Sequence, residues 1–144
     1  KKWFKFKFEV IYFYNVYGPN QIGKGEMATI IGIFESLYKN KKPLTVVRPG
    51  SQTRRFTHVL DTVNVCYLAW KKNLCRHYSV SNKKSFSILA VAKLFRSKIK
   101  FLPKRAGERY VSALTKSNLS NKIYRYYGKI SLDNYVKDFL RKSL

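Results

Sequence analysis

Two arginines beside turns are the strongest candidates for binding chemistry in this chain. Arg54 follows the turn at Pro49-Gly50, and Arg105 lies between Pro103 and Gly107. A guanidinium held at a glycine-containing turn is suited to bidentate hydrogen bonding of a phosphate. Two such turns from separate segments can flank one ligand, so we interpret the pair as a candidate diphosphate clamp. The alternative is that both are solvated or ion-paired surface arginines.

A glycine motif offers a second kind of chemistry, the binding of a dinucleotide. Residues 23–28 (GKGEMA) match the spacing G-x-G-x-x-A ahead of a predicted helix. The dinucleotide fingerprint places its glycines directly at the end of a strand. Here residues 17–22, including Pro19, intervene, and we therefore expect a loop at this position.

Two Tyr-x-x-x-Lys pairs have the spacing in which a lysine assists a catalytic tyrosine. They are Tyr38 with Lys42 and Tyr67 with Lys71. Both tyrosines fall on apolar faces of predicted helices, and both lysines fall near helix ends, where a cation opposes the helix dipole. In a chain with 11 tyrosines and many lysines, chance pairs are expected. We predict no catalytic residue from them.

The histidines and cysteines do not indicate a metal site. His58, Cys66, Cys75 and His77 match no standard zinc spacing. Two cysteines also make no disulfide framework and are typical of reduced thiols. We predict no metal and a cytoplasmic location.

Composition limits the class of protein. The 144 residues carry 30 Lys and Arg against 7 Asp and Glu, a net charge of +23, and 45% are hydrophobic, which excludes a disordered basic tail. The apolar runs at 27–34 and 86–92 are too short to span a bilayer, and the length indicates one domain. Residue 1 is Lys and stands just ahead of a predicted strand. We expect a fragment of a longer protein that binds no membrane.

The charge leaves a basic nucleic-acid-binding module open as an alternative. Residues 4–8 interleave lysine with phenylalanine, as in single-strand binders. However, no block reaches five or six like charges, and lysines are scattered along every segment. This pattern favours ordinary solvated faces, with no specific nucleic-acid partner.

The predicted elements alternate between strands and helices, which is typical of an α/β fold. Residues 8–16 pass from alternation to a continuous apolar run, which indicates a parallel strand covered on both faces. Met27, Ile30 and Phe34 share one face of a predicted helix over 26–39. Further strands are expected at 44–47, 55–59, 76–80 and 99–102, and helices from about Asp61, after Ser85 or Ser87, around 116–122 and from Ser131. The strands at 8–16 and 76–80 are apolar enough to belong to a larger sheet.

Five segments in order resemble motifs of the extended short-chain dehydrogenase/reductases, the NAD-dependent nucleotide-sugar epimerases and dehydratases. Residues 13–21 (FYNVYGPNQ) resemble the turn F-N-V-Y-G-P-x-Q, and residues 42–46 (KPLTV) resemble the strand G-K-P-L-x-I. Residues 52–61 (QTRRFTHVLD) resemble x-x-R-D-F-I-H-V-x-D. Residues 77–81 (HYSVS) are similar to the Y-N-I-G strand, and residues 105–108 (RAGE) to R-x-G-D.

The resemblance implies that residues 1–144 are the C-terminal, substrate-binding part of such an enzyme, with strands that would complete a Rossmann sheet. The missing N-terminal half would bind most of the NAD and carry the catalytic Tyr and Lys. The implied chemistry is reversible hydride transfer between NAD and a sugar carbon of a nucleotide-diphosphate sugar. The resemblance favours a homodimeric UDP-sugar 4-epimerase, and a nucleotide-sugar 4,6-dehydratase or a non-catalytic sugar-nucleotide-binding homologue stays an alternative.

The resemblance also assigns substrate-binding roles by position. Asn15 would hydrogen-bond the diphosphate, and Arg54 and Arg105 would bind its phosphates. Phe56 would line the same pocket, and the helix around Met27 would cover the base.

Further positions would meet the cofactor or depart from the family pattern. Phe13 and Tyr14 would lie beside the nicotinamide end of NAD, and Asp61 would start the helix after the arginine strand. The departures are Tyr12 in place of Arg, Arg55 in place of an acid, Glu108 in place of Asp and Ser79 in place of Asn.

Overall fold

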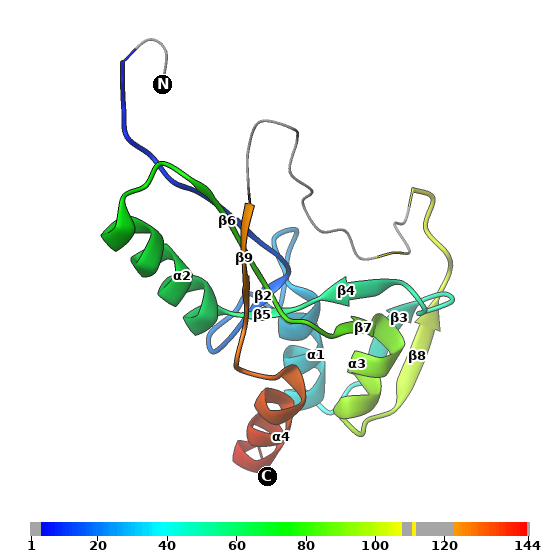
Figure 1. Ribbon diagram of the computed structural model, residues 1–144. Coiled ribbons are helices and arrows are strands. Elements are labelled where there is room, and N and C mark those ends of the chain that lie inside the picture. Colours follow the sequence, from blue (N-terminus) through cyan, green and yellow to red (C-terminus); the bar gives the residue numbers. More distant parts are fainter. Residues whose placement is uncertain (1–3, 108–110, 112–122, 144) are drawn as a thin grey trace.

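The computed structural model describes residues 4–107, 111 and 123–143, which form an α/β fold as predicted (Figure 1). The strands are β1 Val10–Phe13, β2 Val16–Tyr17, β3 Leu44–Val47, β4 Thr53–Arg55, β5 Thr57–His58, β6 His77–Ser81, β7 Ser85–Ser87, β8 Ile99–Leu102 and β9 Ile123–Tyr127. The helices are α1 Ile30–Lys39, α2 Val59–Lys72, α3 Ile88–Leu94 and α4 Leu132–Lys142.

A parallel sheet of order β1-β6-β9 joins three distant parts of the chain. Val10 pairs with His77, which in turn pairs with Ile123. The predicted parallel pairing near the N-terminus is thus confirmed, although the strand covers only Val10–Phe13, and its residues are half-buried or exposed and not covered on both faces as expected. The strand predicted at 76–80 is confirmed as β6 and lies one residue further along. The sequence analysis did not predict β9, and the helix expected around 116–122 lies outside the described residues.

Helix α2 covers one face of this sheet. Its residues Val65 and Ala69 form a small core with Tyr78 and Val80 of β6. The expected start at about Asp61 is wrong, because the helix begins at Val59. The cap is His58, whose Nδ1 accepts a hydrogen bond from the Leu60 backbone N–H at 3.2 Å. Asp61 therefore lies in the first turn, where a carboxylate favours the positive end of the helix dipole.

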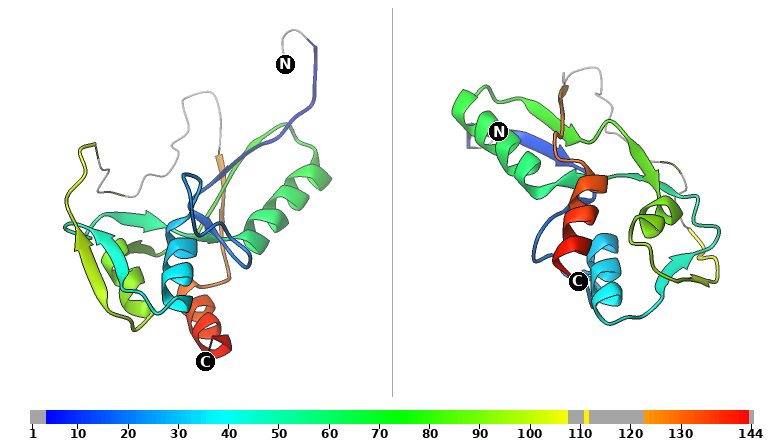
Figure 2. Two further views of the ribbon diagram at one scale, coloured as in Figure 1. Left: turned by 180° about the vertical axis from the view of Figure 1, so that it is seen from behind. Right: turned by 90° about the horizontal axis from the view of Figure 1, so that it is seen from below.

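The larger core lies among α1, α3, α4 and the short strand pairs. Strands β3 and β8 pair in parallel, as do β2 and β5, whereas β4 and β7 are antiparallel. Phe34 of α1 packs edge-on against Phe95, with ring centroids 5.7 Å apart. Helices α1 and α4 lie side by side in both views of Figure 2, and Leu132 and Val136 of α4 belong to the same core.

The predicted start of the first helix is wrong. The helix expected over 26–39 begins at Ile30, because the Thr29 hydroxyl accepts a hydrogen bond from the Gly32 N–H at 3.0 Å and caps it. Met27 precedes the cap and is 80% exposed, so it is not part of the helix. The predicted end at residue 39, beside Asn40, is confirmed.

The predicted bounds of α3, α4, β3 and β8 agree more closely with the structure. Ser87 caps α3 and Ser131 caps α4, as expected of serine at these positions. The bounds predicted for β3 and β8 are confirmed. The extended piece expected at 55–59 is instead split into β4 and β5, and residue 59 already belongs to α2. Within the described residues, no helix is long and apolar enough to cross a membrane.

Candidate functional site

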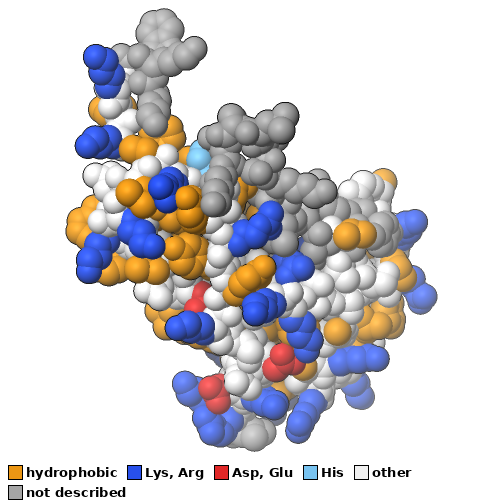
Figure 3. Space-filling view, in the orientation of Figure 1, with side chains coloured by type: hydrophobic (Ala, Val, Ile, Leu, Met, Phe, Trp, Pro, Cys, Tyr) orange, Lys and Arg blue, Asp and Glu red, His pale blue; other side chains and the backbone are white. Residues whose placement is uncertain are grey.

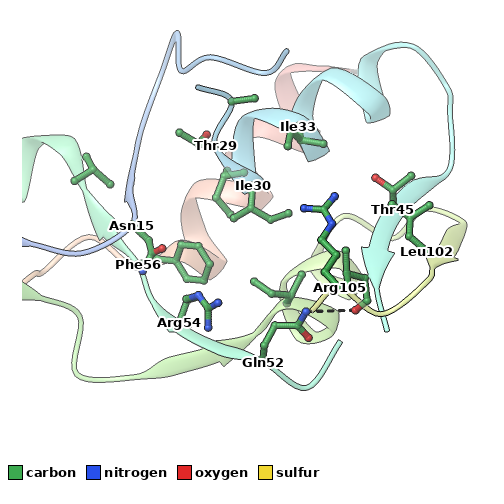
Figure 4. Close-up of a pocket in the computed structure, with 15 residues that line it drawn as sticks. Asn15, Thr29, Ile30, Ile33, Thr45, Gln52, Arg54, Phe56, Leu102 and Arg105 are labelled. Carbon is green, nitrogen blue, oxygen red and sulfur yellow. Dashed lines mark hydrogen bonds between the residues drawn. The ribbon is translucent and has the colours of Figure 1, made fainter. Parts of the chain in front are cut away.

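A cavity of about 400 Å³ lies where the start of α1, the β3–β8 pair and β4 meet (Figure 4). Four residues named from the sequence line it: Asn15, Arg54, Phe56 and Arg105. They come from the β1–β2 connection, from β4 and its continuation, and from the segment after β8. The fold thus brings together side chains that are far apart in the sequence.

The two arginines reach the cavity from different strand pairs. Arg54 stands opposite Phe86 in the antiparallel β4–β7 pair, and its Nη1 donates to the Thr53 carbonyl at 2.8 Å. Arg105 follows β8, which ends at Leu102 beside Val47 of β3. Among the described residues that line the cavity, none is Asp or Glu. The arrangement suits an anionic ligand, because two guanidinium groups face the cavity.

Asn15 is held at the rim by its own backbone geometry. Its φ of 41° lies in the left-handed region, which asparagine tolerates better than most residues. Its Nδ2 donates to the Arg55 carbonyl at 2.8 Å, which ties the β1–β2 connection to β4. An asparagine amide carries two N–H hydrogens, so the group can also donate to a ligand.

Apolar side chains form the remaining wall. Phe56 is buried, with 1% of its surface exposed, and Ile30 and Ile33 line the cavity from α1. Val47 and Leu102 line it from the β3–β8 pair. A cavity with an apolar wall and a few polar groups is typical of a site for a small organic ligand.

Gln52 is a polar cavity residue that was not among the site residues predicted from the sequence. Its side chain is 2% exposed, and its Nε2 donates to the Val47 carbonyl at 3.3 Å, the dashed line in Figure 4. No described residue gives its Oε1 a hydrogen bond. The only signal in the sequence was a glutamine two residues before the candidate clamp arginine.

Three other predicted site residues lie outside this cavity. Met27 does not line it, although the neighbouring Ala28 and Thr29 do. Phe13, at the carboxyl end of β1, is 55% exposed, and Tyr14 follows it. The carboxyl ends of parallel strands are where open α/β sheets bind ligands. Phe13 and Tyr14 thus lie at this edge of the sheet and do not line the arginine cavity.

The first glycine of the motif, Gly23, packs closely against α1, whereas Gly25 has open space around it. A Cβ on Gly23 would lie 2.5 Å from the Gly32 carbonyl oxygen, and one on Gly32 would lie 2.4 Å from the Ile22 carbonyl oxygen. The loop is thus pressed against α1, and neither glycine lies at the end of a strand. The expectation of a loop at 23–28 is confirmed.

The two Tyr-x-x-x-Lys pairs do not contribute to the cavity. Tyr38 packs against the Phe139 ring at a centroid distance of 5.9 Å. Tyr67 lies on the exposed face of α2 beside Trp70. Among the described residues, no group of three or more His, Cys, Asp or Glu side chains could hold a metal ion.

A polar cluster links α1, α2 and α4. The Tyr135 hydroxyl donates to Glu35 Oε1 at 2.7 Å, and burial raises the pKa of both groups. The His58 ring lies edge-on to the Tyr17 ring at 5.2 Å. Burial lowers the pKa of His58, and the negative charge of Asp61 opposes that shift. The neutral imidazole is therefore the form that caps α2.

Positive charge is spread over the face of the molecule that Figure 3 shows. Figure 3 shows Lys and Arg side chains distributed over most of the visible face, with hydrophobic side chains between them. Arg55, the residue after Arg54 in β4, donates through Nη1 to the Asn82 and Lys83 carbonyls. That arginine therefore fixes the loop between β6 and β7.

Comparisons with known proteins all indicate the same family. The model of the "NAD dependent epimerase/dehydratase family" matches residues 2–81, more than half of the chain. A curated protein of Methanocaldococcus jannaschii, "Putative UDP-glucose 4-epimerase", is 30% identical over 109 residues, which are 72% of this chain and 35% of that protein. The chain thus spans about a third of this relative's length.

Two solved structures share the fold. The UDP-glucose 4-epimerase of Thermotoga maritima, solved with UDP-glucose, has a TM-score of 0.77 at 21% identity, over 99% of this chain and 48% of that one. The dTDP-glucose 4,6-dehydratase of Bacillus anthracis, solved with NAD, has a TM-score of 0.71 at 16% identity, over 92% of this chain and 43% of that one. The chain therefore spans about half the length of either structure.

Proposed function

Because the chain belongs to the NAD dependent epimerase/dehydratase family, we propose that its cavity binds the diphosphate of a UDP-sugar within an NAD-dependent 4-epimerase. The observation that carries this proposal is the convergence of Asn15, Arg54 and Arg105 on one cavity. Two cations and a neutral amide can surround a diphosphate, and charge-assisted hydrogen bonds are the strong ones. The M. jannaschii relative, named for UDP-glucose, supports the choice of nucleotide.

The apolar wall completes the proposed ligand site. Ile30, Ile33, Val47 and Leu102 offer a surface for the flat face of a base. The helix start at Thr29 replaces Met27 in this role, because Thr29 lines the cavity and Met27 does not. The base would lie between α1 and the β3–β8 pair, with the diphosphate toward Arg54.

NAD would contact this chain mainly through Phe13 and Tyr14. The exposed Phe13 ring at the carboxyl end of β1 can form one wall of a nicotinamide site. Nucleotide-sugar epimerases use NAD for reversible hydride transfer at a sugar carbon. Gly23 of the glycine motif packs against α1 and the motif does not directly follow a strand, so the rest of the cofactor would be held by residues outside this chain.

The proposal places residues 1–144 as the C-terminal, substrate-binding portion of the enzyme. Helix α2 supports this view, because its outer face exposes large apolar side chains that a further part of the enzyme can cover. They are Leu60, Val63, Tyr67 and Trp70. The proposal extends to a homodimeric enzyme in the cytoplasm, in keeping with the free thiols of Cys66 and Cys75.

A 4,6-dehydratase is the second candidate, because a dehydratase and an epimerase share this fold with TM-scores of 0.71 and 0.77. The test supplies the full-length protein and NAD with UDP-galactose or dTDP-glucose and identifies the products by mass spectrometry and NMR. Formation of UDP-glucose supports the epimerase. A 4-keto-6-deoxy product from dTDP-glucose favours the dehydratase. Tight binding with neither product favours a non-catalytic homologue.

A further inference from the structure

Thr29, which immediately precedes α1, is both the cap of this helix and part of the cavity wall. Its hydroxyl oxygen accepts a hydrogen bond from the Gly32 N–H at 3.0 Å, and the residue lines the cavity. In Figure 4, Thr29, Ile30 and Ile33 follow the start of α1 along the cavity. The position of this helix start therefore sets the shape of one wall of the proposed nucleotide site.

Gln21 holds Thr29 from outside the cavity, which it does not line. The Thr29 oxygen accepts from Gly32, so its own hydrogen is available for donation, and the hydroxyl donates it to Gln21 Oε1 at 2.9 Å. A second hydrogen bond runs from the Thr29 N–H to the Ile22 carbonyl at 3.0 Å. The loop at 23–28 is thus closed by two hydrogen bonds, and both involve Thr29.

The orientation of the Gln21 amide is determined by Tyr135 of α4 and Glu35 of α1. Gln21 Nε2 donates to the Tyr135 hydroxyl at 3.4 Å, and that hydroxyl donates to Glu35 Oε1 at 2.7 Å. Because the tyrosine gives its only hydrogen to the carboxylate, it can only accept from Gln21. The amide nitrogen must then face Tyr135, which leaves the amide oxygen for Thr29. Helix α4 thereby acts on the cavity wall although Tyr135 does not line the cavity.

We propose that Gln21 is a positioning residue for nucleotide binding, which fixes Thr29, and with it the start of α1, against the ligand in the cavity. The inference rests on the proposed function, since it assumes a nucleoside-diphosphate sugar in this cavity. A wall that is fixed before the ligand arrives costs less to order on binding. Without the Gln21 amide, the Ile22–Thr29 hydrogen bond alone closes the loop, and part of the binding free energy is used to order it.

The test is calorimetric titration of the full-length Gln21→Met variant with UDP-glucose and, separately, with NAD. The affinity for UDP-glucose should fall about 3–10-fold, the range for one neutral hydrogen bond. The affinity for NAD should not change, because Phe13 and Tyr14 do not line the cavity. Asn40→Ala is the matched control. Asn40 caps the opposite end of α1 by donating to the Ser36 carbonyl at 2.7 Å, so its variant weakens the same helix but should bind UDP-glucose as wild type.

Thr29→Val tests whether Gln21 acts through Thr29. Valine keeps the shape of threonine and lacks the hydroxyl, so in that background Gln21→Met should lower the affinity for UDP-glucose by less than about twofold. The positioning role of Gln21 is overturned if Gln21→Met binds UDP-glucose as wild type, if it loses as much affinity for NAD, or if its effect is undiminished in Thr29→Val. Each of these results leaves the diphosphate site intact. If wild type binds no UDP-glucose, the proposed function itself fails, and the role of Gln21 fails with it.

Discussion

The carboxylate of Asp61, in the first turn of α2, accepts a hydrogen bond from the backbone N–H of Ile130 at 3.1 Å, in the segment that joins β9 to α4. Its other oxygen accepts one from the Lys129 N–H, also at 3.1 Å. Gly128 lies against the same carboxylate, since a Cβ there would come within 2.8 Å of Asp61 Oδ2. One side chain thus connects α2 to the segment that leads into α4.

Asp61→Ala should therefore destabilise the protein. Two charge-assisted hydrogen bonds and a favourable dipole contact are lost together, which we expect to cost about 1.5–3 kcal/mol in urea unfolding. Asp133→Ala is the matched control. Asp133 also lies in a first helical turn and forms a 3.9 Å ion pair with the exposed Lys84, so its loss should cost less than about 1 kcal/mol. If the two variants lose the same free energy of unfolding, the hydrogen bonds of Asp61 contribute no more to stability than an exposed charge does.

The two helix starts that sequence reasoning misplaced have the same physical cause. The apolar spacing of α1 extends back to Met27, but periodicity does not show where the backbone hydrogen bonds begin, and the Thr29 cap decides that. His58 is an unusual cap, and its ring lies edge-on to that of Tyr17. Ser87 and Ser131 are ordinary caps and were predictable.

Some strands could likewise be located from the local sequence, and others could not. Strand β3 is a short, mostly apolar run between Pro43 and Pro49, and β8 ends at Pro103; both were located from the sequence. Strand β9 reads IYRYY and is defined by its pairing with β6, which is a long-range contact that local pattern does not reveal. Likewise, the two arginines beside turns predicted residues that line the cavity. The burial of Gln52 Oε1 without a hydrogen-bond partner depends on how distant segments pack, which the local sequence does not reveal.

The His58 cap should make stability depend on pH. Burial lowers the folded-state pKa of this imidazole below its usual 6.5. The unfolded chain then binds more protons as pH falls below 6.5, so the stabilisation is complete above that pH and is lost as pH falls through the lowered value. We expect the Tm of wild type to drop between pH 7.5 and 5.

His58→Asn provides the comparison, because asparagine caps a helix without titrating. The Tm of this variant should decline less over the same pH range than that of wild type, measured by circular dichroism. A parallel decline would show that other groups, such as the carboxylates, govern the acid sensitivity.

The net charge of +23 leads to a prediction about nucleic acids. Because lysines and arginines are spread over the surface in Figure 3, binding to DNA should be weak and independent of sequence. For roughly six to ten phosphate contacts, affinity should fall about 10³–10⁵-fold between 50 and 200 mM salt in a fluorescence anisotropy titration. Sequence-selective binding that survives physiological salt would instead favour the nucleic-acid-binding module.

The diphosphate clamp is the central claim, and calorimetric titration of the full-length protein with UDP-glucose tests it most directly. Arg54→Ala and Arg105→Ala should each weaken binding about 10–100-fold, since each removes a charge-assisted hydrogen bond. The double variant should be non-additive, because both arginines share one ligand group. Arg96→Ala, an exposed arginine outside the cavity, should bind as wild type. If Arg96→Ala loses as much affinity as the clamp variants, general positive charge holds the nucleotide and the clamp does not exist.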